Sequence, residues 1–354
     1  MRLSVRPAPR RRLLIASRGL RRLEVAAVEA ARRTIRAIRS VPSVRREAYR
    51  VSNRDGFGNI AWHDGMLGDR VRLRAYARAI DRYVQPGMVV VDLGTGSGVL
   101  ACLAAQRGAH VHAIEHTEVI EHARELARTN DLASSITFHR MHSRDFQAPG
   151  PIDVILHEQV GHNLIDEDMV ENVVSQRDRV LAPNGIVLPA RFALYADPVQ
   201  LRADRTVPYS WEHRFHGLDF SCFAPASGKW PGMNDGSDKR WLAPDDVERN
   251  LAPDQSVLRF DLGTMKRGAL PVRLGYDTTI AESGRLDGFA QYFELAFDDE
   301  IRFKTGPGHA HTHWDGRLLR TEAHDVAAGQ RLVFEMIAAD PTDAQSWSWK
   351  YTIT

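Results

Sequence analysis

The sequence predicts an α/β protein in which a parallel sheet, wound by helices on both faces, precedes an antiparallel β domain. Between about 85 and 190, β-rich apolar runs alternate with helical patterns, as in successive β-α-β units. Beyond 199 the pattern changes to short segments of alternating apolar and polar residues, which is typical of antiparallel strands. A chain of 354 residues with 43% hydrophobic content exceeds the size of a single core, so two domains are expected.

The expected elements follow from this pattern in chain order. In the first part, strands are predicted at 88–94, 110–116, 135–141 and 151–158. Helices are predicted at 99–108, 117–131 and 169–185, the last of them closed by Pro-Asn-Gly. In the second part, alternating segments predict strands at 287–297, 317–326, 330–338 and 345–354.

The charge is distributed unevenly along the chain. Residues 1–50 contain fifteen Arg, no Lys and three Glu, whereas the rest of the chain carries 32 basic and 42 acidic side chains. Within 11–41, apolar residues recur at helical spacing among the arginines. A solvated helical extension, an amphipathic helix on an anionic surface, a transit peptide and a start site placed too far upstream all remain open. We predict a basic extension at 1–46, with an anionic partner as one hypothesis.

Cysteine content and hydropathy exclude other classes of protein. Cys102 and Cys222 are the only cysteines, and no stretch approaches eighteen uncharged apolar residues. Arginines interrupt the apolar runs near the N-terminus, so no secretory signal fits. A cytoplasmic protein without a membrane span is therefore predicted, and no metal site is expected.

The segment VVVDLGTGSGVL at 89–100 contains the first motif that carries chemistry. A strand precedes its glycines and a helix follows them, which is the context of a nucleotide-binding turn. Gly94, Gly96 and Gly98 let the backbone turn tightly and let a ligand approach main-chain amides.

Two acids near this turn indicate the type of ligand. Glu115 ends the next predicted strand, where a carboxylate can accept hydrogen bonds from both ribose hydroxyls of a nucleoside. Asp92 precedes the glycines, and its charge would repel a pyrophosphate but suits an ammonium and a sulfonium. The motif therefore predicts S-adenosylmethionine as the ligand.

The loop HEQVGHNLIDEDM at 157–169 concentrates carboxylates at the end of a predicted buried strand. The parallel arrangement places this loop at the same edge of the sheet as the glycine turn, where ligands of such sheets bind. One of its acids could cap the helix that begins near Met169, with the others solvated. For the pair Glu158 and Glu167 we favour a positively charged substrate.

At this point the sequence resembles the protein arginine methyltransferases. Their acceptor loop has two glutamates nine residues apart and ends in Glu-x-Met, and here Glu158 and Glu167 are nine apart, with Gly161 between them and Met169 after them. The family's next motif, LAPxGxxxPxRxxLY, corresponds to LAPNGIVLPARFALY at 181–195.

Two further motifs extend this resemblance to roughly 49–354. MLGDRVR matches a family helix and is expected to place Met66, Asp69 and Arg72 on one helical face. Thr-His-Trp is intact as Thr312, His313 and Trp314.

The resemblance implies a domain organisation. A Rossmann-like S-adenosylmethionine-binding domain is expected at 47–190, followed by a β-barrel-like substrate domain at 191–354. The segment 203–236 is similar to a dimerisation arm, which implies a homodimer. The implied activity is transfer of a methyl group to the guanidinium of an arginine in a protein or peptide.

The resemblance also implies roles for single residues. Arg72 would bind the carboxylate of S-adenosylmethionine, the methyl donor, and Glu115 would bind its ribose. Ser143 stands where the family has an acid that contacts the adenine amine. Asp69 and His313 would order the site and take up the released proton. Met66, Met169 and Trp314 would line the substrate site, and the two methionines hint at asymmetric dimethylation.

Chemistry explains the need for two carboxylates. A guanidinium has a pKa above about 12 and delocalised lone pairs, so it is a poor nucleophile. If Glu158 and Glu167 both accept hydrogen bonds from it, they hold it and draw positive charge away from the reacting nitrogen.

Departures from the family keep other functions open. Its SEWMGY is HEQVGH here, so Gln159 and Val160 replace the Trp and Met that pack against the substrate, and His162 replaces an aromatic. These changes in the wall of the substrate pocket favour the alternative of a methyltransferase that acts on a small cationic metabolite or a ribosomally made peptide. A binding or scaffolding protein is a further alternative, although it would be expected to have lost one of the two glutamates.

Overall fold

The computed structural model describes residues 44, 47, 56–165, 168–224, 239–341 and 346–354. The chain divides into two units, Met1–Asn53 and Arg54–Thr354, and the second is the one described below. The helical pattern predicted at 11–41 lies outside the described residues, as does all but residue 44 of the basic extension predicted at 1–46.

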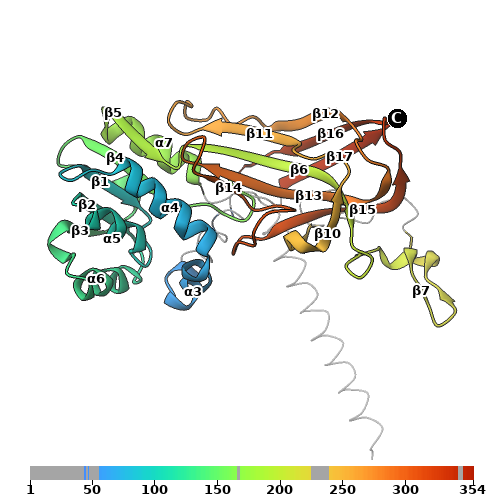
Figure 1. Ribbon diagram of the computed structural model, residues 1–354, viewed down its shortest axis with the longest axis horizontal. Helices are drawn as coiled ribbons and strands as arrows, with labels where there is room; N and C mark the ends of the chain where they lie inside the picture. The colour runs from blue at the N-terminus through green and yellow to red at the C-terminus, as the bar shows by residue number, and fades with distance from the viewer. Residues whose placement is uncertain (1–43, 45–46, 48–55, 166–167, 225–238, 342–345) are drawn as a thin grey trace, which may run out of the picture. The chain divides into compact units, whose positions relative to one another are not determined.

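A five-stranded parallel sheet forms the first half of this unit (Figure 1). Its strands are β1 Val89–Leu93, β2 His110–Glu115, β3 Ile136–Arg140, β4 Ile152–His157 and β5 Leu181–Leu188. They lie in the order β3-β2-β1-β4-β5, and every pair is parallel. The direction of winding reverses between β1 and β4, and ligands of such sheets bind at the carboxyl ends of these two strands.

Helices connect the strands and cover the sheet. They are α3 Ile60–Gly68, α4 Arg70–Tyr83, α5 Val99–Gln106, α6 Ile120–Thr129 and α7 Met169–Val180. In α6 the apolar residues Ile120, Ala123 and Ala127 recur on one face and are fully buried, while its charged residues remain at the surface. The α/β alternation predicted from the sequence is confirmed.

The predicted helix at 169–185 is too long. α7 ends at Val180, and Leu181 begins β5, pairing with Ile152. Pro183 explains the difference, because it has no amide N–H to donate and its ring disfavours a helical residue before it. β5 is an edge strand, which tolerates such a proline.

The single helical face predicted for Met66, Asp69 and Arg72 is also wrong, because the helix breaks between them. α3 ends at Gly68, and Asp69 adopts an extended conformation with φ −73° and ψ 92°. Its carboxylate accepts a hydrogen bond from the Arg72 backbone N–H at 2.9 Å and so caps α4.

The second half of the unit is entirely antiparallel. The larger sheet contains β6 Arg191–Leu201, β9 Lys239–Leu242, β10 Val247–Asn250, β11 Ser256–Asp261, β13 Gly284–Ala296, β14 Arg302–Lys304 and β15 Gly316–Val326. The smaller sheet contains β12 Arg273–Thr279, β16 Arg331–Ala338 and β17 Trp347–Ile353. A two-stranded hairpin consists of β7 Arg214–Phe215 and β8 Leu218–Asp219.

Short 3-10 helices occupy several connections: η1 Ala133–Ser135, η2 Ser143–Asp145, η3 Ser210–Glu212, η4 Ser221–Phe223 and η5 Pro244–Asp246. The strands predicted in the second part of the sequence are present as β13, β15, β16 and β17. A parallel α/β core followed by curled antiparallel sheets confirms the predicted fold class. Within the described residues, no helix is long and apolar enough to cross a membrane.

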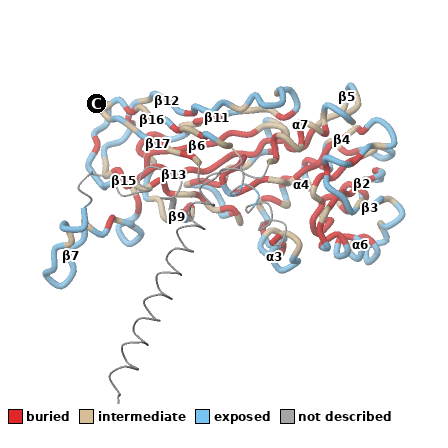
Figure 2. Tube along the Cα trace, turned by 180° about the vertical axis from the view of Figure 1, so that it is seen from behind, coloured by how far each residue is buried: buried red, intermediate tan, exposed pale blue. Residues whose placement is uncertain are grey.

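The two halves share one hydrophobic core, and α4 joins them. Buried residues run along β6 and β13 and through the parallel sheet (Figure 2). Tyr76 of α4 packs edge-on against Phe297, with 4.9 Å between ring centroids. Arg82, also on α4, forms an ion pair with Asp298 at 2.8 Å. These contacts hold α4 against the loop that follows β13.

Candidate active site

The glycine turn leaves the carboxyl end of β1 in the left-handed conformation. Gly94 has φ +71° and Gly96 has φ +53°, values that side chains disfavour. A Cβ on Gly94 would lie 3.1 Å from Gln159 Nε2, and one on Gly96 would lie 2.7 Å from His63 Cε1. Only glycine therefore fits between these side chains and the turn.

Gly98 serves a different contact. It has φ +84° and is the N-terminal cap of α5. A Cβ there would lie 2.6 Å from the Cβ of Ala123 in α6. Its missing side chain therefore permits close packing of α5 and α6, as expected of the third glycine in such a turn.

Asp92 lies beneath the turn and is fully buried. Burial raises the pKa of its carboxyl to about 7, although a hydrogen bond from the Thr95 hydroxyl and another from the Ala101 backbone oppose the shift. The Thr95 Oγ1 to Asp92 Oδ2 distance is 2.5 Å. A cation bound at the turn would favour the ionised form.

Glu115 ends β2 and reaches the same turn. Its carboxylate accepts hydrogen bonds from the Thr117 N–H at 2.8 Å and from the Gly96 N–H at 3.3 Å. Burial alone would raise the pKa of this carboxyl, but contacts with His116 and Thr117 outweigh it and lower the pKa. Glu115 is therefore an ionised acceptor held at the glycine turn.

Ser143 follows β3 on the same edge of the sheet. It is buried at the start of η2, and its backbone carbonyl accepts a hydrogen bond from Gln176 of α7. The neighbouring His142 stacks on His116, with ring centroids 4.4 Å apart. The residue before Ser143 thus contacts the residue that follows Glu115.

Arg72 and Glu158 form a buried ion pair at the centre of this edge. Nη1 of Arg72 lies 2.6 Å from Oε2 of Glu158, and Nη2 donates to the Met66 carbonyl at 2.7 Å. Burial raises the pKa of Glu158, and the positive charge of Arg72 opposes that shift, followed by His313. Within the described part of the chain, Arg72 Nε is buried without a hydrogen-bond partner.

Asp69 and His313 form a second pair beside the first. Nδ1 of His313 lies 2.9 Å from Oδ2 of Asp69, and the His313 backbone N–H donates to the same oxygen at 3.0 Å. Burial would raise the pKa of Asp69, but hydrogen bonds from His313 and from the Arg72 amide outweigh it and lower the pKa. The β-region loop before β15 is thereby tied to the start of α4.

Trp314 holds the acceptor loop in place. Its Nε1 donates to the Val160 carbonyl at 2.7 Å, its ring lies 4.0 Å from that of His313, and it is only 1% exposed. The Trp314 carbonyl in turn lies 2.8 Å from Nδ1 of His162. Met169 is fully buried at the start of α7, whereas Met66 is half-buried.

Two predicted residues of the acceptor loop, Asp166 and Glu167, lie outside the described residues. Of the predicted pair, the described part of the site contains Glu158. Asp168 is described; it has φ +55° and is the N-terminal cap residue of α7.

The sequence prediction missed His63. This residue of α3 is buried, its ring lies against Gly96, and its Nε2 is 2.9 Å from the Phe57 carbonyl. Its position three residues before Met66, one helical turn away, is the signal that could have identified it.

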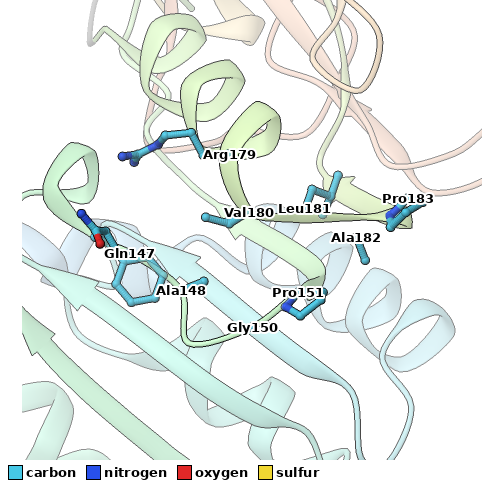
Figure 3. A pocket seen from close by; sticks show the side chains of 10 residues that line it. Gln147, Ala148, Gly150, Pro151, Arg179, Val180, Leu181, Ala182 and Pro183 are labelled. Carbon is cyan, nitrogen blue, oxygen red and sulfur yellow. The ribbon is translucent and has the colours of Figure 1, made fainter.

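A surface hollow of about 410 Å³ lies elsewhere (Figure 3). Pro151, just before β4, and Ala182 and Pro183 of β5 line it. It is therefore at the amino ends of the strands, away from the edge that carries Glu158. In the part of the chain that the structure describes, no group of three or more His, Cys, Asp or Glu could hold a metal ion.

Comparisons with known proteins match both halves. A methyltransferase domain family model matches residues 90–185, and an arginine methyltransferase oligomerization subdomain model matches residues 191–353. Protein arginine N-methyltransferase 1 of Dictyostelium discoideum is 28% identical over 277 residues, covering 76% of this chain and 79% of the relative. Protein arginine N-methyltransferase PRMT10 of Oryza sativa subsp. japonica is 38% identical over 172 residues, covering 48% of this chain and 45% of the relative.

Solved structures agree with these matches. The Trypanosoma brucei PRMT1 enzyme-prozyme heterotetramer with AdoHcy has a TM-score of 0.70 at 23% identity, covering 84% of this chain and 94% of that one. Arabidopsis thaliana protein arginine methyltransferase 10 has a TM-score of 0.65 at 27% identity, covering 79% and 88%.

A glycine turn at the switch point of a parallel sheet, with an acid at the next strand end, is a nucleoside-binding arrangement. Together with the match of residues 90–185 to a methyltransferase domain, it identifies an S-adenosylmethionine-dependent methyltransferase. The chain belongs to the protein arginine methyltransferase family.

The residues at the strand edge fit S-adenosylmethionine, its methyl donor. Glu115 offers a carboxylate for the ribose hydroxyls, and Gly94 and Gly96 add no side chain of their own to the turn. Two buried atoms lack partners among the described residues, Arg72 Nε, which is a donor, and Gln159 Oε1, which is an acceptor. The amino-acid end of S-adenosylmethionine carries one carboxylate and one ammonium, which are the matching groups.

Proposed function

We propose that this enzyme methylates a guanidinium nitrogen of an arginine in a protein or peptide. The observation that carries the proposal is the Arg72–Glu158 pair. At the switch point of the sheet, Glu158 accepts a hydrogen bond from a guanidinium at 2.6 Å. Glu158 follows the end of β4, which is in register with the end of β1, and this supports the proposal that it also accepts a hydrogen bond from a substrate guanidinium beside the donor.

In this proposal the chain prepares the nucleophile. Glu158 and Glu167 accept hydrogen bonds from the substrate guanidinium, fix its plane and draw positive charge away from the attacking nitrogen. In-line attack requires that nitrogen to be held about 3–3.5 Å from the methyl carbon. S-adenosylmethionine supplies the methyl group as an activated sulfonium and leaves as the neutral thioether.

The attacking nitrogen must lose one proton once the new N–C bond forms. His313 is the proposed acceptor, with Asp69 orienting its ring and stabilising the imidazolium. The 2.9 Å hydrogen bond between His313 Nδ1 and Asp69 Oδ2 supports this assignment.

Donor binding is assigned to residues around the turn. Arg72 would bind the carboxylate, and Glu115 the ribose, with Ser143 near the adenine. Gly94, Gly96 and Gly98 would shape the turn, and Asp92 would favour the positive end of the donor. His63 is added because its ring lies against Gly96.

The substrate wall is assigned to three residues with different burial. Trp314 and Met169 are almost completely buried, so we infer that they support the wall from behind, whereas half-buried Met66 is placed to contact substrate. The Met66 carbonyl already accepts a hydrogen bond from Arg72 at 2.7 Å, which fixes its position.

A small cationic metabolite remains a second candidate substrate. The observation that favours it is the polar acceptor loop, in which Gln159 places an amide against Gly94. A site that binds a small cation through polar groups does not need an apolar channel for the aliphatic part of an arginine side chain.

The proposal is tested by comparing acids of the acceptor loop. Glu158→Gln and Glu167→Gln are expected to retain donor binding while lowering kcat by about 100-fold or more, because an amide no longer offsets the substrate's charge. Asp168→Asn is the matched control, because Asn tolerates the left-handed conformation at φ +55° and should have little effect. Asp166→Asn should behave in the same way.

Salt dependence distinguishes a guanidinium clamp, in which Glu158 and Glu167 bind the substrate directly, from a generally acidic surface. If the surface attracted the substrate only by its charge, each of the four substitutions would reduce activity by a similar amount, and the effect would decrease with added salt. Equal losses in all four variants would therefore contradict the guanidinium clamp.

We further infer a two-domain organisation at 47–190 and 191–354, and a homodimer formed through the arm at 203–236. The match of 191–353 to an oligomerization subdomain supports the dimer. So does the β7–β8 hairpin, on which Phe215 is 61% and Leu218 is 62% exposed.

The basic extension at 1–46 is proposed to bind an anionic partner, on the strength of its charge alone. Deleting it should leave peptide methylation intact and reduce retention on heparin at low salt; unchanged retention would oppose the idea. A cytoplasmic location is inferred from the two cysteines, both of which are free. Cell fractionation tests it, and recovery of the protein outside the cytoplasm would contradict it.

A further inference from the structure

Gln159 lies directly against the glycine turn. Three atoms of its side chain, Nε2, Cγ and Cδ, would be 3.1, 3.4 and 3.6 Å from a Cβ placed on Gly94. The carboxamide end therefore rests on the first glycine of the turn, which has φ +71°. Gln159 reaches this place because β1 and β4 are adjacent, with Leu93 opposite His157 in their register.

The oxygen of this carboxamide is buried and unsatisfied. Gln159 Oε1 exposes less than 1 Å² and has no hydrogen-bond partner among the residues that the structure describes. Leaving such an acceptor unpaired costs its desolvation free energy, so buried polar atoms of this kind usually have a hydrogen-bond partner.

Both neighbours of Gln159 are held by other residues. The Glu158 side chain is paired with Arg72 at 2.6 Å, and the Val160 carbonyl accepts a hydrogen bond from Trp314 at 2.7 Å. These contacts favour the observed position of Gln159 against the turn. A ligand that binds there must bring the missing N–H donor.

The charges around Gln159 indicate which ligand group this is. Arg72 pairs with Glu158 through Nη1, and its Nε is a buried donor without a partner among the described residues, which suits a carboxylate. Gln159 Oε1 is an unpaired acceptor that suits an ammonium, which has three N–H donors and no acceptor. An α-amino acid end presents these two groups together.

We propose that Gln159 Oε1 accepts a hydrogen bond from the α-ammonium of S-adenosylmethionine and that Arg72 and Gln159 together read the amino-acid end of the donor. This rests on the proposed function of the site. Gln159 is a binding residue that touches the donor, and it takes part in no bond making or breaking. By holding the amino-acid end, it sets where the adjacent sulfonium methyl lies relative to Glu158.

Calorimetry with two ligands tests the hydrogen bond in the full-length protein. The ligands are S-adenosylhomocysteine and its deamino analogue, which keeps the carboxylate and lacks the ammonium. Gln159→Met keeps the length that packs on Gly94 and removes the acceptor. This variant is expected to bind S-adenosylhomocysteine about tenfold more weakly than the wild type does, and to bind the deamino analogue with nearly unchanged affinity. If this variant does not fold, Gln159→Leu replaces it in the same comparison of the two ligands.

Gln147→Met is the matched control, because Gln147 lines the hollow of Figure 3, away from the site. It should leave both affinities unchanged. Equal losses for both ligands in Gln159→Met would show a packing effect and overturn the proposal. An unchanged affinity together with a raised KM for peptide would also overturn it, by placing the carboxamide against the guanidinium. Failure of the wild-type protein to bind S-adenosylhomocysteine would instead reject the donor site itself.

Discussion

Nη1 of Arg72 and Oε2 of Glu158 lie 2.6 Å apart and join the start of α4 to the end of β4. Both side chains are largely removed from water, with exposed fractions of 5% and 13%. Breaking a buried ion pair by removing one partner leaves an uncompensated charge. The pair therefore ties the charge state of the proposed substrate acceptor to a residue proposed to bind the donor.

Removing Arg72 should shift the pH dependence of catalysis. Burial raises the pKa of Glu158 and Arg72 opposes this, so Arg72→Met should raise that pKa further. Because catalysis is proposed to need ionised Glu158, activity is lost as pH falls through its pKa. The acidic limb of kcat, measured at saturating donor and peptide, should move to higher pH.

Arg72→Lys is the control for this profile, because it retains a positive charge near Glu158. Its acidic limb should lie between those of wild type and Arg72→Met. An acidic limb that stays in place or moves to lower pH in Arg72→Met would show that Glu158 does not control the profile.

Asp92 should destabilise the ligand-free enzyme above neutral pH. Burial raises its folded pKa to about 7, whereas an unfolded Asp has a pKa of about 3.9. Protonated Asp92 therefore stabilises the fold fully below about pH 4, and this contribution is lost as pH rises through about 7. Asp92→Asn cannot ionise, so its gain in unfolding free energy over wild type should be larger at pH 8 than at pH 5, by on the order of 2 kcal/mol.

Denaturant unfolding of both proteins at the two pH values measures this difference. Taking the difference between variant and wild type cancels the effect of other buried acids, including Asp197, whose pKa burial raises to about 6. A gain that is the same at both pH values would mean that Asp92 titrates normally in the fold.

The Asp69–His313 pair should affect turnover more than donor affinity. Asp69→Asn keeps a side chain that can cap α4 but removes the charge that stabilises an imidazolium. We expect kcat to fall by about 10- to 100-fold with S-adenosylhomocysteine affinity and helix content unchanged. An equal loss in donor affinity would show that Asp69 acts by organising α4 rather than through His313.

The exposed β7–β8 hairpin should carry the dimer contact. Phe215→Asp combined with Leu218→Asp puts charge on two side chains that are 61% and 62% exposed, and should convert a dimer to a monomer in analytical ultracentrifugation. Val272→Asp, at a residue 48% exposed outside the arm, is the control and should remain dimeric. A wild-type monomer, or a dimer that survives the double substitution, would contradict this interface.

The sequence predicts best those structural features that depend on residues close together in the chain. The glycine turn was predictable because a β-rich run, three spaced glycines and a helical pattern follow one another directly. The break at Asp69 was not, because capping by its own side chain competes with an otherwise continuous helical pattern. The early start of β5 at Leu181 depends on pairing with β4, which helical periodicity does not report.

Contacts between distant segments decided the rest of the site. His63 lies against Gly96 because α3 packs over the turn; its spacing from Met66 could mark it as a site residue, but that spacing does not predict the contact with Gly96. The pairing of Arg72 with Glu158 similarly depends on where α4 crosses the end of β4. The resemblance to a family identified Arg72 and Glu158 as site residues, but it did not predict that they pair with each other.

Product analysis tests the central claim most directly. The enzyme is incubated with labelled S-adenosylmethionine and a peptide containing one arginine, alongside the same peptide with lysine in its place. Fragmentation mass spectrometry then locates the methyl group. We predict label on a guanidinium nitrogen of the arginine peptide, none on the lysine peptide, and about 100-fold less product with Glu158→Gln. Label on the lysine peptide, or on an atom other than a guanidinium nitrogen, would contradict the assignment of Glu158 as a guanidinium acceptor.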